Sequence, residues 1–251
     1  MIDLADIAVI VGVLFLAGLV KGVVGLGLPT VSLALLTPLL GLPAAMAAML
    51  LPSFLTNLQQ ALTGGDVAAM LRRFWPFLVP VALGTLAASG AVAWVETDLL
   101  VLLLGGSIAL YAALGLLAPP WPQPGRHERW LGPICGGATG LLTGMTGSFV
   151  IPAVPYLQAL GLGRDRLVQI MGATFTVATL ALALGLGGQG LIGGGAALGT
   201  LAGVVPAFLG MTVGRRLRGR LSETTFRRAL FTALLLLGIW MIAREAVSVA
   251  P

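Results

Sequence analysis

Long apolar segments alternate with short polar or glycine-rich stretches along the whole chain. A transmembrane helix needs about 20 mostly apolar residues, and several segments approach that length. We expect helical segments at residues 4–20, 28–40, 43–62, 74–95, 99–118, 131–144, 149–160, 167–186, 195–213 and 226–243. Three of them, at 28–40, 131–144 and 149–160, are too short to cross a bilayer comfortably. The pattern predicts an all-α membrane protein with broken or re-entrant helices.

Two glycine-rich interruptions flank these short segments, and they are similar to each other. The first is AGLVKGVVGLGLP at residues 17–29, and the second is TGLLTGMTGSFVIP at residues 139–152. The aligned glycines are Gly18, Gly22 and Gly25 in the first and Gly140, Gly144 and Gly147 in the second, each set followed by a proline. Farther along, PVALGT at 80–85 matches PAFLGM at 206–211. The matches indicate a tandem duplication with a period of about 120–126 residues.

The duplication divides the chain into three parts. Repeat one covers residues 1–120, a cytoplasmic linker covers 121–130, and repeat two covers 131–251. Each repeat holds about five helical segments, an odd number. Successive repeats therefore enter the membrane in opposite directions.

Arginines concentrate in particular loops and predict the orientation. Those that we assign to the cytoplasmic side are Arg72, Arg73, Arg126, Arg129, Arg164, Arg166, Arg215, Arg216, Arg218, Arg220, Arg227 and Arg228. Loops rich in basic residues face the cytoplasm, whereas the loops at 96–98 and 187–195 lack them and are expected outside. Both termini are then periplasmic, and equivalent loops of the two repeats face opposite sides. Inverted repeats with broken helices that meet near the midplane are a recurring transporter architecture.

The composition agrees with a chain that lies mostly in a lipid bilayer. Hydrophobic residues make up 58% of the 251 residues and charged residues only 9%, whereas a soluble domain carries about 25% charged residues. A net charge of +5 could suggest a nucleic-acid partner, but the positive-inside rule already explains the arginines, so we expect no nucleic-acid binding. We expect a multi-pass protein of the bacterial inner membrane.

Each interruption is a candidate anion site. Irregular backbone at membrane depth is tolerated only where protein buries it or a cavity meets it. A new helix should begin after each break, near Leu28 and near Phe149, with unpaired N–H groups and the positive end of its dipole at the break. Two such ends near the midplane would bind an anion through backbone alone. The alternative is that the glycines only allow close helix packing.

Lys21 is the only lysine, and it lies within the first interruption. A basic residue inside a membrane segment marks a functional site by default. If the first helix stops halfway across the bilayer, Lys21 faces the substrate. If residues 4–20 span fully, Lys21 instead reaches the inner interface and snorkels there.

Neutral polar side chains gather near both interruptions and could hold an oxyanion. Asn57 and Gln60 are three positions apart and share a helix face. The predicted binding residues are Lys21, Gly22, Gly25, Gly27, Asn57, Gln60, Thr143, Gly144, Thr146, Gly147, Ser148 and Gln169. The alternative for any one polar side chain is an interhelical hydrogen bond.

Several kinds of site have no support in the sequence. No Asp or Glu lies in the middle of a predicted span, so a cation site or carboxylate proton relay is not indicated. No metal-ligand cluster, catalytic triad or phosphate-binding lysine motif is present. We therefore expect no enzyme activity, no metal and no cofactor.

The motifs GLVKGVVGLGLP at 18–29, TPLLGLP at 37–43 and GLLTGMTGSFVIPAVPYLQALGL at 140–162 resemble the sulfite exporter TauE/SafE family, also called the toluenesulfonate uptake permease family. The resemblance covers nearly the whole chain. It implies transport of sulfur-containing anions such as sulfite, sulfoacetate and related organosulfonates, although some members carry other small organic anions. Both export and uptake occur in the family, so the direction does not follow.

Three functional hypotheses remain open at this point. The first is a secondary transporter of a small anion that works by alternating access. The second is an anion channel whose two breaks form a fixed constriction. The third is a membrane scaffold without transport. The oligomeric state also stays open, with a homodimer as one option.

Overall fold

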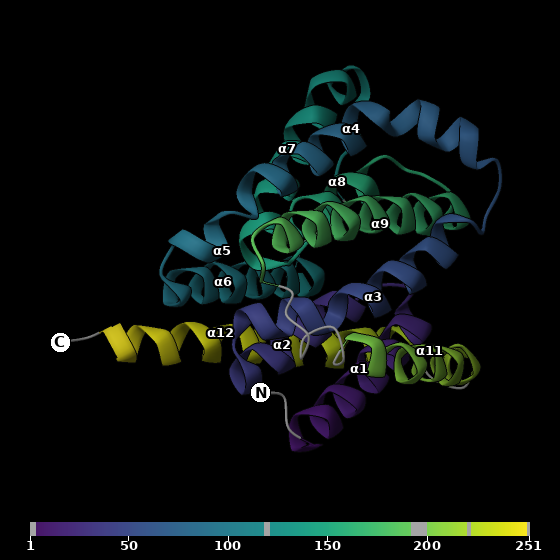
Figure 1. The fold of residues 1–251 in the computed structure, drawn as a ribbon. Helices are drawn as coiled ribbons and strands as arrows, with labels where there is room; N and C mark the ends of the chain where they lie inside the picture. Colours follow the sequence, from purple (N-terminus) through teal and green to yellow (C-terminus); the bar gives the residue numbers. More distant parts are fainter. Residues whose placement is uncertain (1–3, 118–120, 192–199, 220–221, 250–251) are drawn as a thin grey trace.

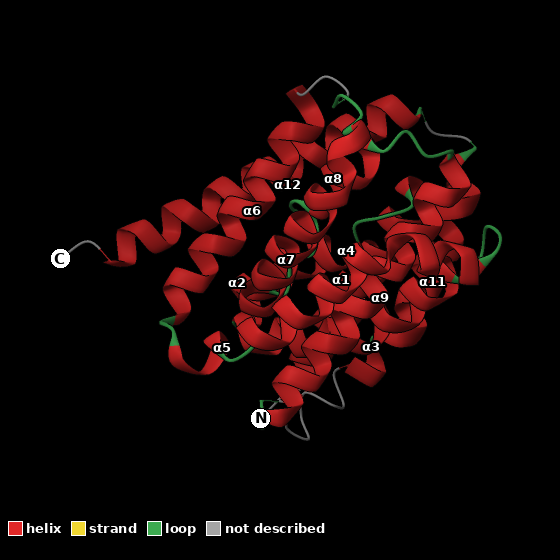
Figure 2. Ribbon diagram, turned by 90° about the horizontal axis from the view of Figure 1, so that it is seen from above, coloured by secondary structure: helices red, strands yellow, loops and turns green. Residues whose placement is uncertain are grey.

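The structure is a computed structural model that describes residues 4–117, 121–191, 200–219 and 222–249. Throughout these ranges the regular elements are helices, and no strand is found (Figures 1 and 2). An all-α membrane protein is therefore confirmed. Parts of some predictions lie outside the described residues: positions 192–195 of the second outer loop, 195–199 of the ninth segment, Arg220 and the two chain ends.

The helices follow the predicted segments closely. Their bounds are α1 Leu4–Val24, α2 Leu28–Leu40, α3 Leu42–Ala61, α4 Val67–Ala88, α5 Ala91–Trp94, α6 Thr97–Leu117, α7 Glu128–Thr146, α8 Ala153–Ala159, α9 Arg164–Gly188, α11 Val204–Arg218 and α12 Glu223–Val249, with a short 3-10 turn at Gly125–His127. Among the described residues, five helices are long and apolar enough to cross a membrane: α1, α4 with α5, α6, α9 and α12. The chain is thus a multi-pass membrane protein.

The first interruption breaks the chain where the sequence predicts. α1 ends at Val24, and α2 begins at Leu28. Gly25 and Gly27 between them have φ angles of 92° and 109°, a backbone region that glycine enters without steric cost. The predicted start near Leu28 is confirmed.

The second interruption differs from the prediction at its far end. α7 ends at Thr146, and Gly147 follows with φ 73°. The next helix, α8, begins at Ala153, so the predicted start near Phe149 is wrong by four residues. Pro152 is the N-cap residue of α8, and a proline at a helix start removes no hydrogen bond from the helix.

Helices from one predicted repeat pack mainly against helices from the other. α1 packs along α11, α7 along α4, α3 along α9 and α6 along α12. Figure 1 shows α1 beside α11 and, at the opposite end of the view, α7 beside α4. The two halves of the sequence are therefore not separately packed bodies.

The repeated glycines lie at these crossings. A Cβ atom on Gly18 would strike the carbonyl oxygen of Ala207 in α11, and one on Gly140 would strike that of Val81 in α4. In return, a Cβ on Gly210 would strike the carbonyl of Phe15, and one on Gly84 would lie 2.8 Å from that of Gly137. Glycine permits such close backbone approach in membranes.

These reciprocal contacts match the predicted duplication position by position. Ala207 aligns with Val81 in the PAFLGM and PVALGT motifs, as Gly18 aligns with Gly140. The α1–α11 crossing and the α7–α4 crossing thus repeat one arrangement. This supports the prediction of two inverted repeats at 1–120 and 131–251, which stays a prediction.

Loops predicted to share a side of the membrane lie together. Arg73 pairs with Glu128 at 3.3 Å, and Arg73 and Arg166 line one cavity with the loop between α3 and α4. On the other side, Asp98 lines a cavity with the turn at Gly41 and the end of α12. Arg244 also lies there, so it is an exception to the gathering of arginines on one side.

Candidate functional site

Lys21 lies in the last turn of α1, and its side chain points into the protein. Only 3% of the residue surface is exposed. Because α1 continues to Val24, the helix is long enough to span, yet Lys21 does not reach outward to the interface. The sequence left two alternatives: a short first helix with Lys21 facing the substrate, or a full-length helix with Lys21 at the interface. In the structure the helix is full-length, but Lys21 faces inward.

Two neutral side chains of α3 hold the Lys21 amine. Its Nζ donates to Thr56 Oγ1 at 3.2 Å and to Asn57 Oδ1. Among the described residues, no carboxylate pairs with Lys21. The salt bridge found among them joins Arg73 and Glu128 instead. A buried cation with only neutral partners lacks a counter-charge, and an anion would supply it.

Asn57 offers a further unused donor at this position. Its Oδ1 must face Lys21, because an ammonium group only donates. The Asn57 Nδ2 is buried and has no hydrogen-bond partner among the described residues. An unpaired buried amide is costly, and an oxyanion would satisfy it.

A cavity of about 170 Å³ opens beside Lys21. Its lining comes from the first break, the end of α3, the start of α9 and the end of α11: Lys21, Gly22, Val24, Gly25, Thr56, Gln59, Gln60, Thr63, Val168, Met211, Arg215 and Arg218. We call it the Lys21 cavity. Three of the lining residues are cationic and none is a carboxylate. The cavity therefore favours an anion over a cation or a zwitterion.

Arg215 and Arg218 enter this site although the sequence analysis used them only for orientation. They lie in the last turn of α11, which the glycine contacts bring alongside α1. At Gly22, an added Cβ would strike the carbonyl oxygen of Met211 and lie 2.8 Å from the backbone nitrogen of Arg215. The duplicated glycine motif was the signal that could have placed these arginines next to Lys21.

The predicted residues of the second break do not reach the Lys21 cavity. Thr143 Oγ1 donates to Thr139 O at 2.7 Å, and Thr146 Oγ1 donates to Leu142 O at 2.7 Å. Thr146 Oγ1 also accepts from the Ser148 N–H at 3.2 Å. These hydroxyls stabilise the shape of the break, whereas the buried Ser148 Oγ has no partner among the described residues.

Gln169 belongs to a neighbouring cavity rather than to that of Lys21. Its Nε2 donates to Gly65 O at 3.4 Å, while Gln60 Nε2 donates to Val168 O at 2.9 Å. The Gln60 bond joins the end of α3 to the start of α9, and the Gln169 bond joins α9 to the loop between α3 and α4. Gln169 lines a separate space with Arg73 and Arg166. The sequence analysis placed Gln60 and Gln169 in one site, but in the structure Gln60 lines the Lys21 cavity and Gln169 lines the neighbouring one.

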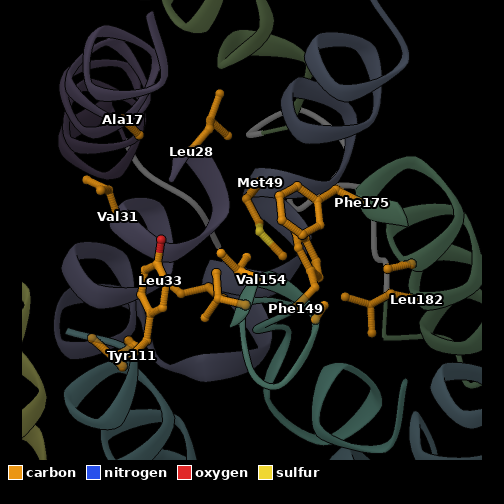
Figure 3. Packing of buried hydrophobic residues seen from close by; sticks show 14 of the residues in the cluster. Ala17, Leu28, Val31, Leu33, Met49, Tyr111, Phe149, Val154, Phe175 and Leu182 are labelled. Carbon is orange, nitrogen blue, oxygen red and sulfur yellow. The ribbon is translucent and has the colours of Figure 1, made fainter. Parts of the chain in front are cut away.

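The two breaks lie beside the same helix, α9, but at different heights along it. Along α9, a Cβ on Gly25 would approach Val168, and the ring of Phe149 lies 5.3 Å from that of Phe175. Seven positions of an α-helix correspond to about 10 Å. Figure 3 shows Phe149, Phe175 and Met49 grouped around the second break. The breaks are therefore staggered, which differs from the expectation that their amides converge on one point.

Among the predicted glycines, the structure separates lining from packing positions. Gly25 lines the Lys21 cavity, and Gly22 both lines it and packs against α11. Gly144 packs against α4, where an added Cβ would lie 2.6 Å from Thr85 O. Gly147 faces Met46 and Leu33. Gly27 precedes α2 and meets Val20.

Similarity to known proteins agrees with this architecture. Residues 10–241 match the model of the family described as sulfite exporter TauE/SafE. Comparisons with curated proteins and with solved structures found no match. The match extends across both breaks and all the described helix crossings. The chain thus belongs to the sulfite exporter TauE/SafE family, a family of membrane transporters of sulfur-containing anions.

Proposed function

We propose that the protein is a secondary transporter that moves a small sulfur-containing anion, sulfite or an organosulfonate such as sulfoacetate, across the bacterial inner membrane by alternating access. The observation that carries the proposal is Lys21, a buried cation held only by neutral groups at the edge of a cavity without a lining carboxylate. A permanently empty site of this kind would be electrostatically unfavourable. A bound oxyanion balances it.

The Lys21 cavity offers donors suited to a sulfonate or sulfite oxygen. Lys21 supplies the buried charge. Asn57 does not line the cavity, but its buried Nδ2 has no partner among the described residues and lies behind Lys21, so an anion bound deeper than the cavity could accept from it. Arg215 and Arg218 line the cavity on the side where the loop arginines gather. Their guanidinium groups keep a positive charge that attracts an anion from solution. The arginines would draw the anion in, and Lys21 would hold it.

The packing of helices from one predicted repeat against helices from the other suggests how access alternates. α1 with α11 forms one close pair, and α7 with α4 forms its counterpart at the second break. In the conformation described here the Lys21 cavity lies beside the arginine-rich loops, so it corresponds to an inward-facing state. Rocking of the two pairs against the α3–α9 contact would close this side and open the other.

A counterflow experiment in proteoliposomes tests the proposal. Vesicles are loaded with unlabelled sulfite or sulfoacetate, and entry of the labelled anion is followed over time. Saturable uptake that unlabelled anion on the opposite side accelerates is the expected result for alternating access. Taurine, a zwitterion, should not compete, because the lining carries net positive charge.

Other results would overturn the proposal. Large unitary currents in planar bilayers, without counterflow, would identify a channel. Counterflow of lactate but not of sulfonates would identify a transporter of other small organic anions. Absence of any anion flux in well-folded protein would leave the scaffold hypothesis.

The proposed orientation has its own test. With the arginine-rich loops in the cytoplasm, both termini lie in the periplasm. Single cysteines introduced at Thr97 and at Gly163, after replacement of Cys135, should label from opposite sides of intact cells. Labelling of both positions from one side would reject the orientation.

A further inference from the structure

A second and larger cavity lies away from the Lys21 cavity, at the starts of α4 and α7. Its volume is about 660 Å³, within the range of small-molecule sites. Its lining comes from α4, α7, α8 and the 3-10 turn: Arg73, Phe74, Pro76, Phe77, Gly125, Arg126, Glu128, Arg129, Gly132 and Tyr156. We call it the Arg126 cavity. It shares no lining residue with the Lys21 cavity.

Its charged residues leave a net positive rim. Glu128 pairs with Arg73 at 3.3 Å, and the Arg73 guanidinium also lies 4.9 Å from the centre of the Phe74 ring. Arg126 and Arg129 are exposed and line the cavity. Two positive charges therefore remain after the ion pair. They favour a ligand with a phosphate or another oxyanion.

The interior of the cavity is apolar and aromatic. Phe77 and Tyr156 are buried and stack with ring centres 5.3 Å apart. Gly132 keeps the space above Tyr156 open, since an added Cβ would lie 3.0 Å from its hydroxyl. A ligand that fills this cavity needs an apolar part as well as an anionic head.

The surroundings place the cavity at the membrane interface. Trp75 and Trp130 neighbour lining residues in the sequence, and more than half of each is exposed. Tryptophan is enriched at the level of lipid headgroups. Ile134, one turn into α7 from Trp130, is also exposed, as expected for a lipid-facing helix. Anionic headgroups are abundant at this level, and basic pockets between helices recognise them.

We propose that the Arg126 cavity binds an anionic phospholipid, with its phosphate on Arg126 and Arg129 and the start of an acyl chain over Phe77 and Tyr156. Bound lipid would bridge the starts of α4 and α7, the helix pair of the second break. The proposal is independent of the transported substrate, because it uses other residues and another cavity.

Thermal unfolding in mixed micelles tests this directly. Phosphatidylglycerol, phosphatidylcholine and soluble glycerol 3-phosphate are each added to purified protein, and bound phosphorus per protein is counted after washing. Phosphatidylglycerol should raise the melting temperature and be retained, whereas the other two should not. The variant Arg126→Gln/Arg129→Gln should lose at least half of both effects.

A matched control removes the same charge elsewhere. Arg216→Gln/Arg228→Gln takes away two exposed arginines of the same side that line neither cavity, and it should keep lipid retention. Equal losses in both double variants would show a diffuse charge effect and overturn the site. Stabilisation by glycerol 3-phosphate, or by an aryl sulfonate that displaces the lipid, would overturn the lipid as occupant.

Discussion

The helices that lead into the first and second breaks make the same glycine contacts with their partner helices, but different side chains surround the two breaks. At both breaks a helix packs its glycines against a partner from the other half, through Gly18 on Ala207 and Gly140 on Val81. Lys21 in the first repeat aligns with Thr143 in the second. Lys21 reaches across to α3, whereas Thr143 bonds within its own helix and break. The comparison teaches that the two breaks have the same glycine packing, whereas the buried lysine lies at the first break alone.

The largest expected effect comes from removing that charge. Lys21→Met should lower anion affinity and counterflow by roughly 100-fold, because loss of a buried charged partner costs about 2–5 kcal/mol and each 1.4 kcal/mol is about tenfold. Thr143→Val, at the matching position, should change counterflow by less than about threefold. Both variants are compared at equal protein content and similar melting temperature. Similar losses in the two would show that the breaks contribute equally.

The shared packing should respond equally in both copies. Gly18→Ala and Gly140→Ala should each lower the free energy of unfolding by about 1–3 kcal/mol, because the added methyl group meets backbone. Gly12→Ala in α1 and Gly137→Ala in α7 are the controls, since among the described residues no other helix comes within 4 Å of an added Cβ there. The controls should be neutral or slightly stabilising. Unfolding in mixed micelles measures all four, and a large difference between the first two would contradict the equivalence.

Arg215 and Arg218, which are more exposed than Lys21, should contribute less than it does. Arg215→Gln/Arg218→Gln should weaken anion binding by about tenfold at low salt, and the difference should shrink above 0.1 M salt, where charges are screened beyond about 10 Å. Arg216→Gln/Arg228→Gln serves as the control of equal charge. Titration of binding at several salt concentrations measures the effect. A loss that does not depend on salt would place these arginines in direct contact with bound anion.

The smallest effects should distinguish two threonines near the breaks. Thr146→Val removes the acceptor for the Ser148 N–H and should cost about 1 kcal/mol of stability with unchanged transport. Thr56→Val removes a Lys21 partner and should raise the half-saturating anion concentration a few-fold. Paired unfolding and counterflow measurements separate the outcomes. Transport loss in Thr146→Val would extend the site to the second break.

Much of the fold follows from the sequence because local rules govern it. Apolar length predicts the spans, and three of the glycines with positive φ, Gly25, Gly27 and Gly147, lie in the predicted interruptions. The start of α8 was missed because apolar residues continue from Phe149, while the position of Pro152 decides where the helix begins. Hydropathy alone does not contain that information.

The candidate site was only partly predictable because it depends on partners distant in sequence. Lys21, Gly25 and Gln60 were found from their type and place. Arg215 and Arg218 required the α1–α11 pairing, which hydropathy does not reveal. Thr143 and Thr146 looked like ligands in the sequence, but helix hydroxyls commonly bond the carbonyl one turn back, as both do here.

Because α1 packs against a helix near the other end of the chain, this contact can form only late in synthesis. α1 ends at Val24, and its partner α11 begins at Val204, so at about 5–20 residues per second the ribosome needs roughly 10–40 s to deliver one after the other. For that time the face with Gly18 and Gly22 must remain against lipid or an insertion factor. During synthesis, therefore, a nascent chain exists for that time in which this face of α1 lacks its partner helix.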